Sequence, residues 1–210
     1  MIKNSSEFLF NTIAPFYGLF YQYQKKSFIK VINHASKELD LKKFNTILDV
    51  GCGTGALCSV LNELGLKVTG VDTAEEMLKI ARKKVKNQAI DFSNANILNG
   101  LPYDNDSFDI TIASYVAHGM KKESRKKMYA EMSRVSKCEV IIYDYNSKRS
   151  LLTSIVEWLE KGDYFNFIKN PELEMKNCTF ELEECFSNVK VVNVDVRASW
   201  YICTPNKNSR

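Results

Sequence analysis

The segment Asn45–Gly55 constrains the fold of this chain more than any other part of it. Its apolar, β-branched run leads to Asp49, and glycines then occupy positions 51, 53 and 55. Apolar residues at helical spacing follow directly, over residues 56–64. This order predicts a buried strand, a tight turn and the start of a helix. Because glycines let a ligand approach the backbone beside the positive end of a helix dipole, the segment predicts a site for a nucleotide-like cofactor.

The composition limits the class of protein. With 210 residues, of which 45% are hydrophobic and 26% charged, the chain suits one globular domain over residues 1–210. A formal charge of +4 does not indicate nucleic-acid binding, and the basic run 121–127 is expected to be a solvated helix face. No apolar run reaches the length of a membrane span, and the first six residues lack the apolar core of a signal peptide. We expect a cytoplasmic monomer or homodimer.

The cysteines and histidines do not form a recognisable metal site. Six cysteines, at positions 52, 58, 138, 178, 185 and 203, include no Cys-x-x-Cys pair, and the two histidines are isolated. We therefore expect no metal and no disulfide framework, but reduced thiols. Cys52 lies within the glycine turn, where we expect it to be a small residue in a tight place and not a nucleophile.

Strand-like and helix-like segments alternate through the first two thirds of the chain. Strands are expected at 46–50, 67–71, 89–93, 108–114 and 139–143, and helices at 56–64, after Thr73 and at 123–135. Thr73 and Glu76 have the spacing of a capping box, and Met77 belongs to the buried face of the helix that follows. This alternation predicts an α/β fold with a doubly wound, mostly parallel sheet, whose ligands bind beyond the carboxyl ends of the strands.

Both ends of the chain depart from this pattern. Residues 1–44 are expected to form an N-terminal helical segment, dense in aromatic residues from 13 to 23. Residues 147–176 are rich in aromatic residues, such as Trp158, and poorly periodic. A helix near 180–186 should follow, and then two alternating segments, 189–196 and 199–204. These two lie so close in sequence that they can pair only as antiparallel strands.

Two classes of cofactor compete for the glycine turn. Residues 51–56 can be fitted to the Gly-x-Gly-x-x-Gly/Ala pattern of dinucleotide-binding proteins. Asp72, at the end of the second strand, can accept hydrogen bonds from both hydroxyls of a ribose in either class. Asp49 before the turn and the third glycine, Gly55, instead resemble the first motif of the class I (seven-stranded) S-adenosylmethionine-dependent methyltransferases.

The segment 96–109 adds to this resemblance. Leu101-Pro102-Tyr103 followed by Ser107-Phe108-Asp109 is similar to the family segment between the adenine-contacting acidic residue and the fourth strand. Residues 13–17 and 114–118 resemble segments of the group around the quinone-biosynthesis C-methyltransferases, which also includes many small-molecule N- and O-methyltransferases. The resemblance extends from about residue 10 to residue 204.

The resemblance implies a seven-stranded sheet with an antiparallel C-terminal strand. It also implies S-adenosylmethionine as cofactor, with S-adenosylhomocysteine as product. The glycines would lie close to the methionine moiety, Asp49 would lie near its amino group, and Asp72 would bind the ribose. Asn96 occupies the position where the family usually has an aspartate that contacts the adenine. An asparagine carbonyl can still accept from the adenine amino group. Residues 147–176 lie where the family commonly has a substrate-covering insertion. The cofactor-binding residues that the resemblance implies are Asp49, Gly51, Cys52, Gly53, Gly55, Asp72, Thr73, Met77, Asn96, Ile97 and Ser114.

The expected reaction is methyl transfer to a small-molecule acceptor by in-line displacement. Positioning can supply most of the acceleration, and a base is needed only if the acceptor must lose a proton. His118, after the fourth strand, is the candidate base, since histidine ordinarily titrates near neutral pH, although it could instead pack in the pocket wall. Tyr17 is the second catalytic candidate, either closing over the sulfonium or packing in the core. Asp144 could contact the substrate or cap the next segment.

Two other functions stay open from the sequence. One is a regulatory module that binds S-adenosylmethionine without turnover, since Asn96 departs from the family and no catalytic pair is evident. The other is a nicotinamide-dependent oxidoreductase, which Gly55, the segment 101–109 and the terminal hairpin disfavour.

Overall fold

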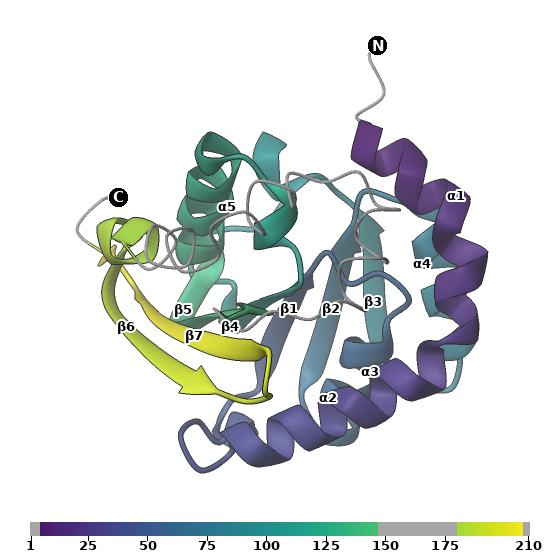
Figure 1. Ribbon diagram of the computed structural model, residues 1–210, viewed down its shortest axis with the longest axis horizontal. Coiled ribbons are helices and arrows are strands. Elements are labelled where there is room, and N and C mark those ends of the chain that lie inside the picture. Colours follow the sequence, from purple (N-terminus) through teal and green to yellow (C-terminus); the bar gives the residue numbers. More distant parts are fainter. Residues whose placement is uncertain (1–4, 147–179, 208–210) are drawn as a thin grey trace. The chain divides into compact units, whose positions relative to one another are not determined.

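The computed structural model describes residues 5–146 and 180–207, which belong to two compact units, residues 1–96 and residues 97–210 (Figure 1). We call them the first and second unit. The insertion expected at 147–176 lies outside the described residues, and the single-domain organisation stays a prediction. None of the helices in the described part of the chain has both the length and the apolar character that a membrane span requires.

The first unit begins with two helices and continues as alternating strands and helices. Its strands β1, β2 and β3 are all parallel and lie in the order β3-β2-β1. The elements are α1 (Ser5–Leu19), α2 (Tyr21–Ala35), the 3-10 helix η1 (Leu41–Lys43), β1 (Thr46–Val50), α3 (Ala56–Glu63), β2 (Lys67–Asp72), α4 (Glu75–Lys84) and β3 (Ile90–Asn94). The strands predicted in this part of the sequence are confirmed to within one residue.

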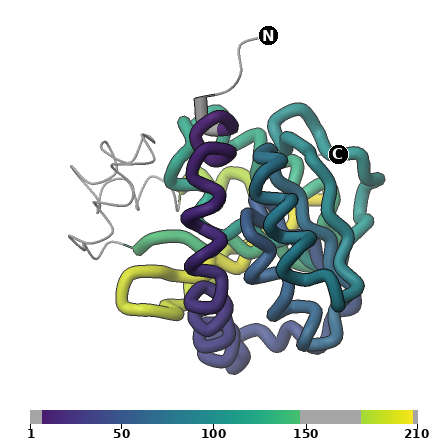
Figure 2. The backbone as a smooth tube through the Cα atoms, turned by 90° about the vertical axis from the view of Figure 1, so that its right-hand side faces the viewer, coloured from purple at the N-terminus to yellow at the C-terminus, as the bar shows by residue number. Residues whose placement is uncertain are grey.

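Apolar side chains from the strand before the glycine turn and from the helix after it contribute to the core of the first unit. Ile47 and Leu48 of β1 are fully buried, as are Cys58 and Leu61 of α3. Helix α1 lies beside α4, as Figure 2 shows, and Ala14 of α1 packs with residues of α4. Burial of these apolar side chains, at about 25 cal/mol per Å² of apolar surface, holds β1 and α3 on either side of the turn.

The start of α4 differs from the prediction. The predicted capping box of Thr73 and Glu76 is wrong, because the N-cap residue is Ala74 and its side chain makes no capping hydrogen bond. The Ala74 N–H donates instead to Oδ1 of Asp72, and the Glu76 N–H donates to Oδ1 of Asn11 in α1. The acceptors that a helix start requires thus come from the preceding strand and from a distant helix.

The second unit contains four strands in the order β4-β5-β7-β6. Strand β4 is parallel to β5, whereas β7 is antiparallel to both β5 and β6. The elements are the 3-10 helix η2 (Ile97–Asn99), β4 (Phe108–Ser114), the 3-10 helix η3 (Ala117–Gly119), α5 (Lys122–Val135), β5 (Ser136–Tyr145), β6 (Phe186–Asn193) and β7 (Ala198–Pro205). Residues 180–185 are also helical. The chain therefore has the predicted α/β fold, a mostly parallel seven-stranded sheet with an antiparallel C-terminal strand. Strand β6 begins three residues earlier than predicted.

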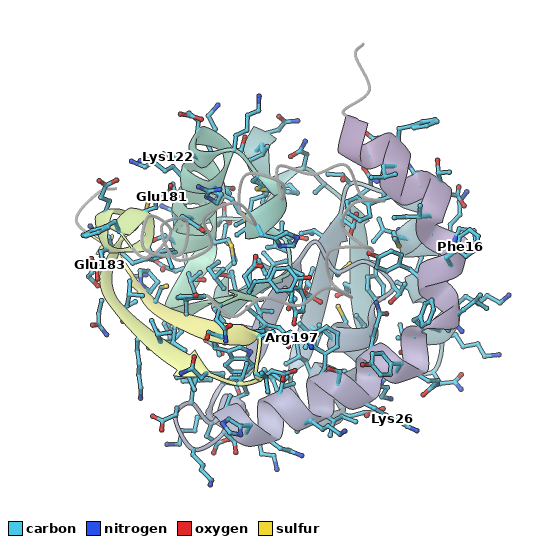
Figure 3. The ribbon with its side chains drawn as sticks, in the orientation of Figure 1. Phe16, Lys26, Lys122, Glu181, Glu183 and Arg197 are labelled. Atoms are coloured by element: carbon cyan, nitrogen blue, oxygen red, sulfur yellow. The ribbon has the colours of Figure 1, made fainter. Side chains whose placement is uncertain are left out.

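One residue of the basic run 121–127 is not solvated, contrary to the prediction. Arg125 is buried and donates from Nε and Nη2 to the two carboxylate oxygens of Glu181, both at 2.9 Å. Its Nη1 donates to the Met120 carbonyl at 2.7 Å. This bidentate ion pair fixes α5 against the helical residues 180–185. Glu181 is labelled in Figure 3.

Candidate functional site

The glycine turn is positioned by the register of two parallel strands. Val50 of β1 lies opposite Val71 of β2, so the turn begins beside the end of β2. The N–H groups of Gly51 and Cys52 both donate to the Val71 carbonyl, at 2.8 and 3.0 Å. The φ angles at positions 51, 53 and 55 are 72°, 52° and 73°, a left-handed region that favours glycine. A Cβ added at Gly53 would meet nothing within 4 Å, so the turn is open there.

Asp72 joins the turn to the end of β2. Its Oδ2 accepts from the Gly53 N–H and its Oδ1 from the Ala74 N–H, each at 2.8 Å. Burial raises the pKa of this carboxyl, and the backbone donors oppose that rise. Each carboxylate oxygen can accept a second hydrogen bond, so Asp72 can take two hydroxyl donors without losing its hold on the turn. Thr73, the next residue, accepts at its carbonyl from Nδ2 of Asn94 in β3.

Asp49 is a buried carboxyl that lacks a donor at one oxygen. It is 1% exposed; its Oδ2 accepts from the Cys58 thiol at 3.1 Å, and its Oδ1 has no hydrogen-bond partner among the described residues. Burial, and to a lesser extent the charge of Asp72, raises the pKa of Asp49 to about 7. An orphaned buried acceptor is costly, and a ligand that brings a positively charged donor would satisfy it.

Three other predicted residues of the first unit lie in packed surroundings. Cys52 is buried, which raises the pKa of its thiol, and its Sγ packs against Gly70. Met77 is buried in a cluster with Ala14 and Ala74, and Tyr17 packs on that cluster while its ring meets Phe10 edge-on at 6.4 Å. A contact of Tyr17 with a sulfonium stays a prediction.

Asn96 and Ile97 are divided between the two units. The Ala95 N–H donates to the Asp72 carbonyl, which ties the end of β3 to the end of β2, and Asn96 follows directly. Ile97 begins the second unit in η2 and is buried. The remaining predicted cofactor residue, Ser114, ends β4 in the second unit, where its Oγ is buried without a hydrogen-bond partner among the described residues.

An aromatic cluster follows β4 and β5 in the second unit. Ser114 lies opposite Tyr143 in the register, so Tyr115 comes next to the end of β5. Tyr115 has a φ of 56°, and its N–H donates to the Tyr143 carbonyl at 2.8 Å. Its ring centroid lies 4.8 Å from that of Tyr143 and 5.0 Å from that of Tyr145. A tyrosine held in the left-handed region is strained by roughly 1–3 kcal/mol, and such residues concentrate at functional sites.

His118 and Asp144 form a buried pair within this cluster. Nδ1 of His118 lies 2.9 Å from Oδ1 of Asp144, and the His118 backbone N–H donates to Oδ2 at 3.1 Å. The Tyr145 N–H also donates to Oδ1, at 2.8 Å. The side chains of His118 and Asp144 are 9% and 8% exposed. When Nδ1–H donates to the carboxylate, the lone pair of the neutral imidazole is on Nε2, which is the arrangement of a general base.

Tyr115 and Tyr143 of the cluster are donors and not bases at neutral pH. The hydroxyls of Tyr115 and Tyr143 lie 3.0 Å apart. Burial raises the pKa of both phenols, that of Tyr143 to about 12. His118 is therefore the member of the cluster suited to taking up a proton.

Sequence reasoning missed the partnership of Asp144 with His118 and did not select Tyr115 or Tyr145. The available signal was positional, because Tyr115 and the Tyr143–Tyr145 segment follow neighbouring strands of a predicted parallel sheet. The described residues contain no group of three or more His, Cys, Asp or Glu that could hold a metal ion.

The proteins whose sequences are similar to this chain include methyltransferases. A family described as "Methyltransferase domain" matches residues 47–139. The ubiquinone/menaquinone biosynthesis C-methyltransferase of Campylobacter jejuni is 32% identical over 143 residues, covering 60% of this chain and 57% of that enzyme. The chain spans less than two thirds of the length of the curated relatives it matches.

Solved structures share the fold. A putative S-adenosylmethionine-dependent methyltransferase from Methanococcus maripaludis is similar with a TM-score of 0.70 and 16% identity, covering 94% of each chain. The magnesium protoporphyrin IX methyltransferase of Synechocystis, solved with bound S-adenosylhomocysteine, has a TM-score of 0.59 and 16% identity, covering 87% of this chain and 83% of that one.

Proposed function

Since the chain belongs to the class I S-adenosylmethionine-dependent methyltransferases, we propose that it transfers the methyl group of S-adenosylmethionine to a small-molecule acceptor. The observation that carries the proposal is the glycine turn between two acidic side chains. Within the part of the chain that the structure describes, Oδ1 of Asp49 has no donor, and both oxygens of Asp72 can accept further hydroxyls. A cofactor that carries an ammonium group and a ribose matches these two carboxylates.

The residues of the first unit would hold the cofactor. Asp49 would bind its ammonium group and Asp72 its ribose hydroxyls, while the open backbone at Gly53 admits the ligand. Asn96 would accept from the adenine amino group. When bound, the cofactor supplies an activated methyl group, so the protein is left to position the acceptor and exclude water.

His118 is proposed as the general base, with Asp144 as its positioning residue. The pair is supported by the 2.9 Å contact between Nδ1 and Oδ1 and by the low exposure of both side chains. Asp144 would hold the ring in the tautomer whose Nε2 takes a proton from the acceptor. This arrangement favours an acceptor that must lose a proton, such as a phenol or an acidic carbon. A cytoplasmic location, and a monomer or homodimer, complete the proposal.

A thermal-shift experiment tests the cofactor. S-adenosylhomocysteine should raise the melting temperature, and NADH should leave it unchanged, because ligand binding to the native state stabilises it. Asp72→Asn keeps one carbonyl acceptor but removes the charge, and it should weaken binding at least tenfold by calorimetry. Asp91→Asn, at an exposed position of β3, is the matched control. Stabilisation by NADH alone would refute the methyltransferase assignment.

A second experiment tests the base. Metabolite extracts incubated with deuteromethyl-labelled S-adenosylmethionine would identify the acceptor by mass spectrometry. With that acceptor, His118→Gln should lower kcat by roughly 10²-fold or more, because no side chain at that position would then take up the acceptor's proton. Asp144→Asn should lower kcat and shift the pH profile while KM changes little. Full turnover by His118→Gln would remove this residue from the mechanism, and binding without any turnover would favour the regulatory alternative.

A further inference from the structure

Helix α1 is apolar on both of its faces. Among its residues, only Glu7 is charged. On the inner face, Ala14 packs with Ala74 and Met77. On the outer face, and continuing into α2, five large apolar side chains are between 60% and 79% exposed. We call them the apolar stripe: Phe8, Phe16, Leu19, Phe20 and Tyr23. A helix at the surface of a globular domain normally carries polar residues on its outer side, so this stripe marks a contact surface.

The stripe extends from α1 into α2. Phe8 and Phe16 are about two helical turns apart in α1, with the exposed Thr12 between them. Leu19 ends α1, and Phe20 and Tyr23 carry the stripe into α2. The Phe20 N–H donates to the Tyr17 carbonyl, and the Phe20 carbonyl accepts from the Gln24 N–H, so the backbone is hydrogen-bonded across the junction. Figure 3 shows Phe16 and Lys26 projecting outward from α1 and α2.

The charged side chains that follow the stripe in α2 are all positive. Residues 8–37 contain four lysines, at 25, 26, 30 and 37, and no acidic residue. Lys25 pairs with Glu63, but Lys26 and Lys30 are exposed and form no ion pair with any residue that the structure describes. In α4, which packs against α1, Glu75 and Glu76 are already paired with Arg82 and Lys79. The α2 end of the stripe therefore carries two exposed lysines, Lys26 and Lys30, that no acidic side chain of the described residues pairs with.

We propose that the apolar stripe and its lysines dock the protein on an anionic lipid membrane. Such a surface offers an apolar layer bordered by negative charge. Helices with Phe and Leu on one side and Lys beside them lie in the interface plane, with their apolar side chains at the acyl boundary. Tyr23 suits the headgroup level, where aromatic residues with a polar end are enriched. A second copy of the chain fits less well, because its residues 8–37 contain no acidic side chain that could meet these lysines.

Vesicle flotation of the full chain, without cofactor, tests the proposal. The wild-type protein should float with phosphatidylcholine vesicles that contain about 30% phosphatidylglycerol, and not with phosphatidylcholine alone, because anionic lipid attracts basic segments. Binding should weaken sharply in about 0.5 M salt. Phe16→Ser/Phe20→Ser should reduce the partition coefficient at least roughly tenfold, because these side chains lose apolar burial. Lys26→Ala/Lys30→Ala should reduce it by about 25-fold, or about fivefold per lysine.

Matched controls separate a local surface from general adhesion. Phe180 is 55% exposed, and Lys121 and Lys127 are exposed, all in the second unit. Phe180→Ser and Lys121→Ala/Lys127→Ala should leave partitioning within about twofold of wild type if the stripe is the docking surface. Absence of flotation with anionic vesicles would overturn the proposal, as would an undiminished partition of the Phe16→Ser/Phe20→Ser variant. A dimer in light scattering that this variant dissociates, with no vesicle binding, would assign the stripe to a second copy instead. The test requires no turnover, so it stands or falls independently of the proposed function.

Discussion

Replacing Asp49 with asparagine should stabilise the protein at neutral and alkaline pH while removing a ligand contact. In the folded protein, burial raises the pKa of this carboxyl from its ordinary 3.8 to about 7. A carboxyl whose pKa is higher in the folded state contributes stability that is fully present below the unfolded-state pKa and is lost as the pH rises through the folded-state pKa. At about 1.4 kcal/mol per pKa unit, ionising Asp49 costs about 4 kcal/mol in total, of which about 3 kcal/mol is lost between pH 5 and pH 8.

Urea denaturation of the ligand-free protein across this pH range measures the effect. The Asp49→Asn variant has no charge to bury. The difference between its free energy of unfolding and that of the wild type should therefore increase by about 3 kcal/mol, in favour of the variant, from pH 5 to pH 8. Comparing the two proteins cancels the titrating groups that do not interact with Asp49, and Asp91→Asn, at an exposed site, controls for the loss of a surface charge. A difference that stays flat with pH would show that the buried carboxyl does not ionise at this cost, and the argument from its orphaned oxygen would fail.

The raised pKa of Asp49 predicts that ligand binding releases a proton from this carboxyl. A cationic ammonium beside Oδ1 favours the ionised form of Asp49, so S-adenosylhomocysteine binding near pH 6 should release up to about one proton. Calorimetry in buffers of different ionisation enthalpy would detect the release. Asp49→Asn should abolish it.

Two further substitutions test the packing described above. Gly70→Ala should destabilise the protein by about 1–3 kcal/mol in urea denaturation, because the added Cβ would lie 2.8 Å from the Phe92 ring and 2.9 Å from Cys52 Sγ; an unchanged midpoint would contradict this crowding. Arg125→Met should cost about 3–5 kcal/mol by leaving the Glu181 charge buried and unpaired, and Arg125→Met/Glu181→Leu should recover most of that loss. A double variant as unstable as the single one would show that packing, and not the unpaired charge, sets the cost.

The regular elements were predictable because their signals are local. The strand 46–50 ends at a glycine turn and the strand 108–114 begins after a turn-rich segment, and both were placed correctly. The start of α4 was not, because Thr73 is a good capping residue in isolation, whereas Asn11 supplies an acceptor from a helix that is distant in sequence. Local preference cannot anticipate such a long-range partner.

In the candidate site, too, the residues with local sequence signals were predictable and the long-range contacts were not. His118 was selected from its position after a strand, but its partner depends on the register of β4 and β5, which brings the residues after Ser114 next to Tyr143 and Asp144. The orphaned oxygen of Asp49 and the left-handed backbone at Tyr115 are likewise properties of packing, and no residue pattern displays them.

The position of β7 between β5 and β6 has a consequence for synthesis on the ribosome. Strand β5 is complete once Tyr145 has been made, but its second neighbour, β7, spans residues 198–205. At about 5–20 residues per second, the edge of β5 that β7 will cover lacks this partner for several seconds of translation. An open edge with a run such as Val140–Tyr143, buried in the finished protein, is a template for wrong pairing. A nascent chain stalled before β7 should therefore recruit chaperones that a chain released with β7 complete does not need.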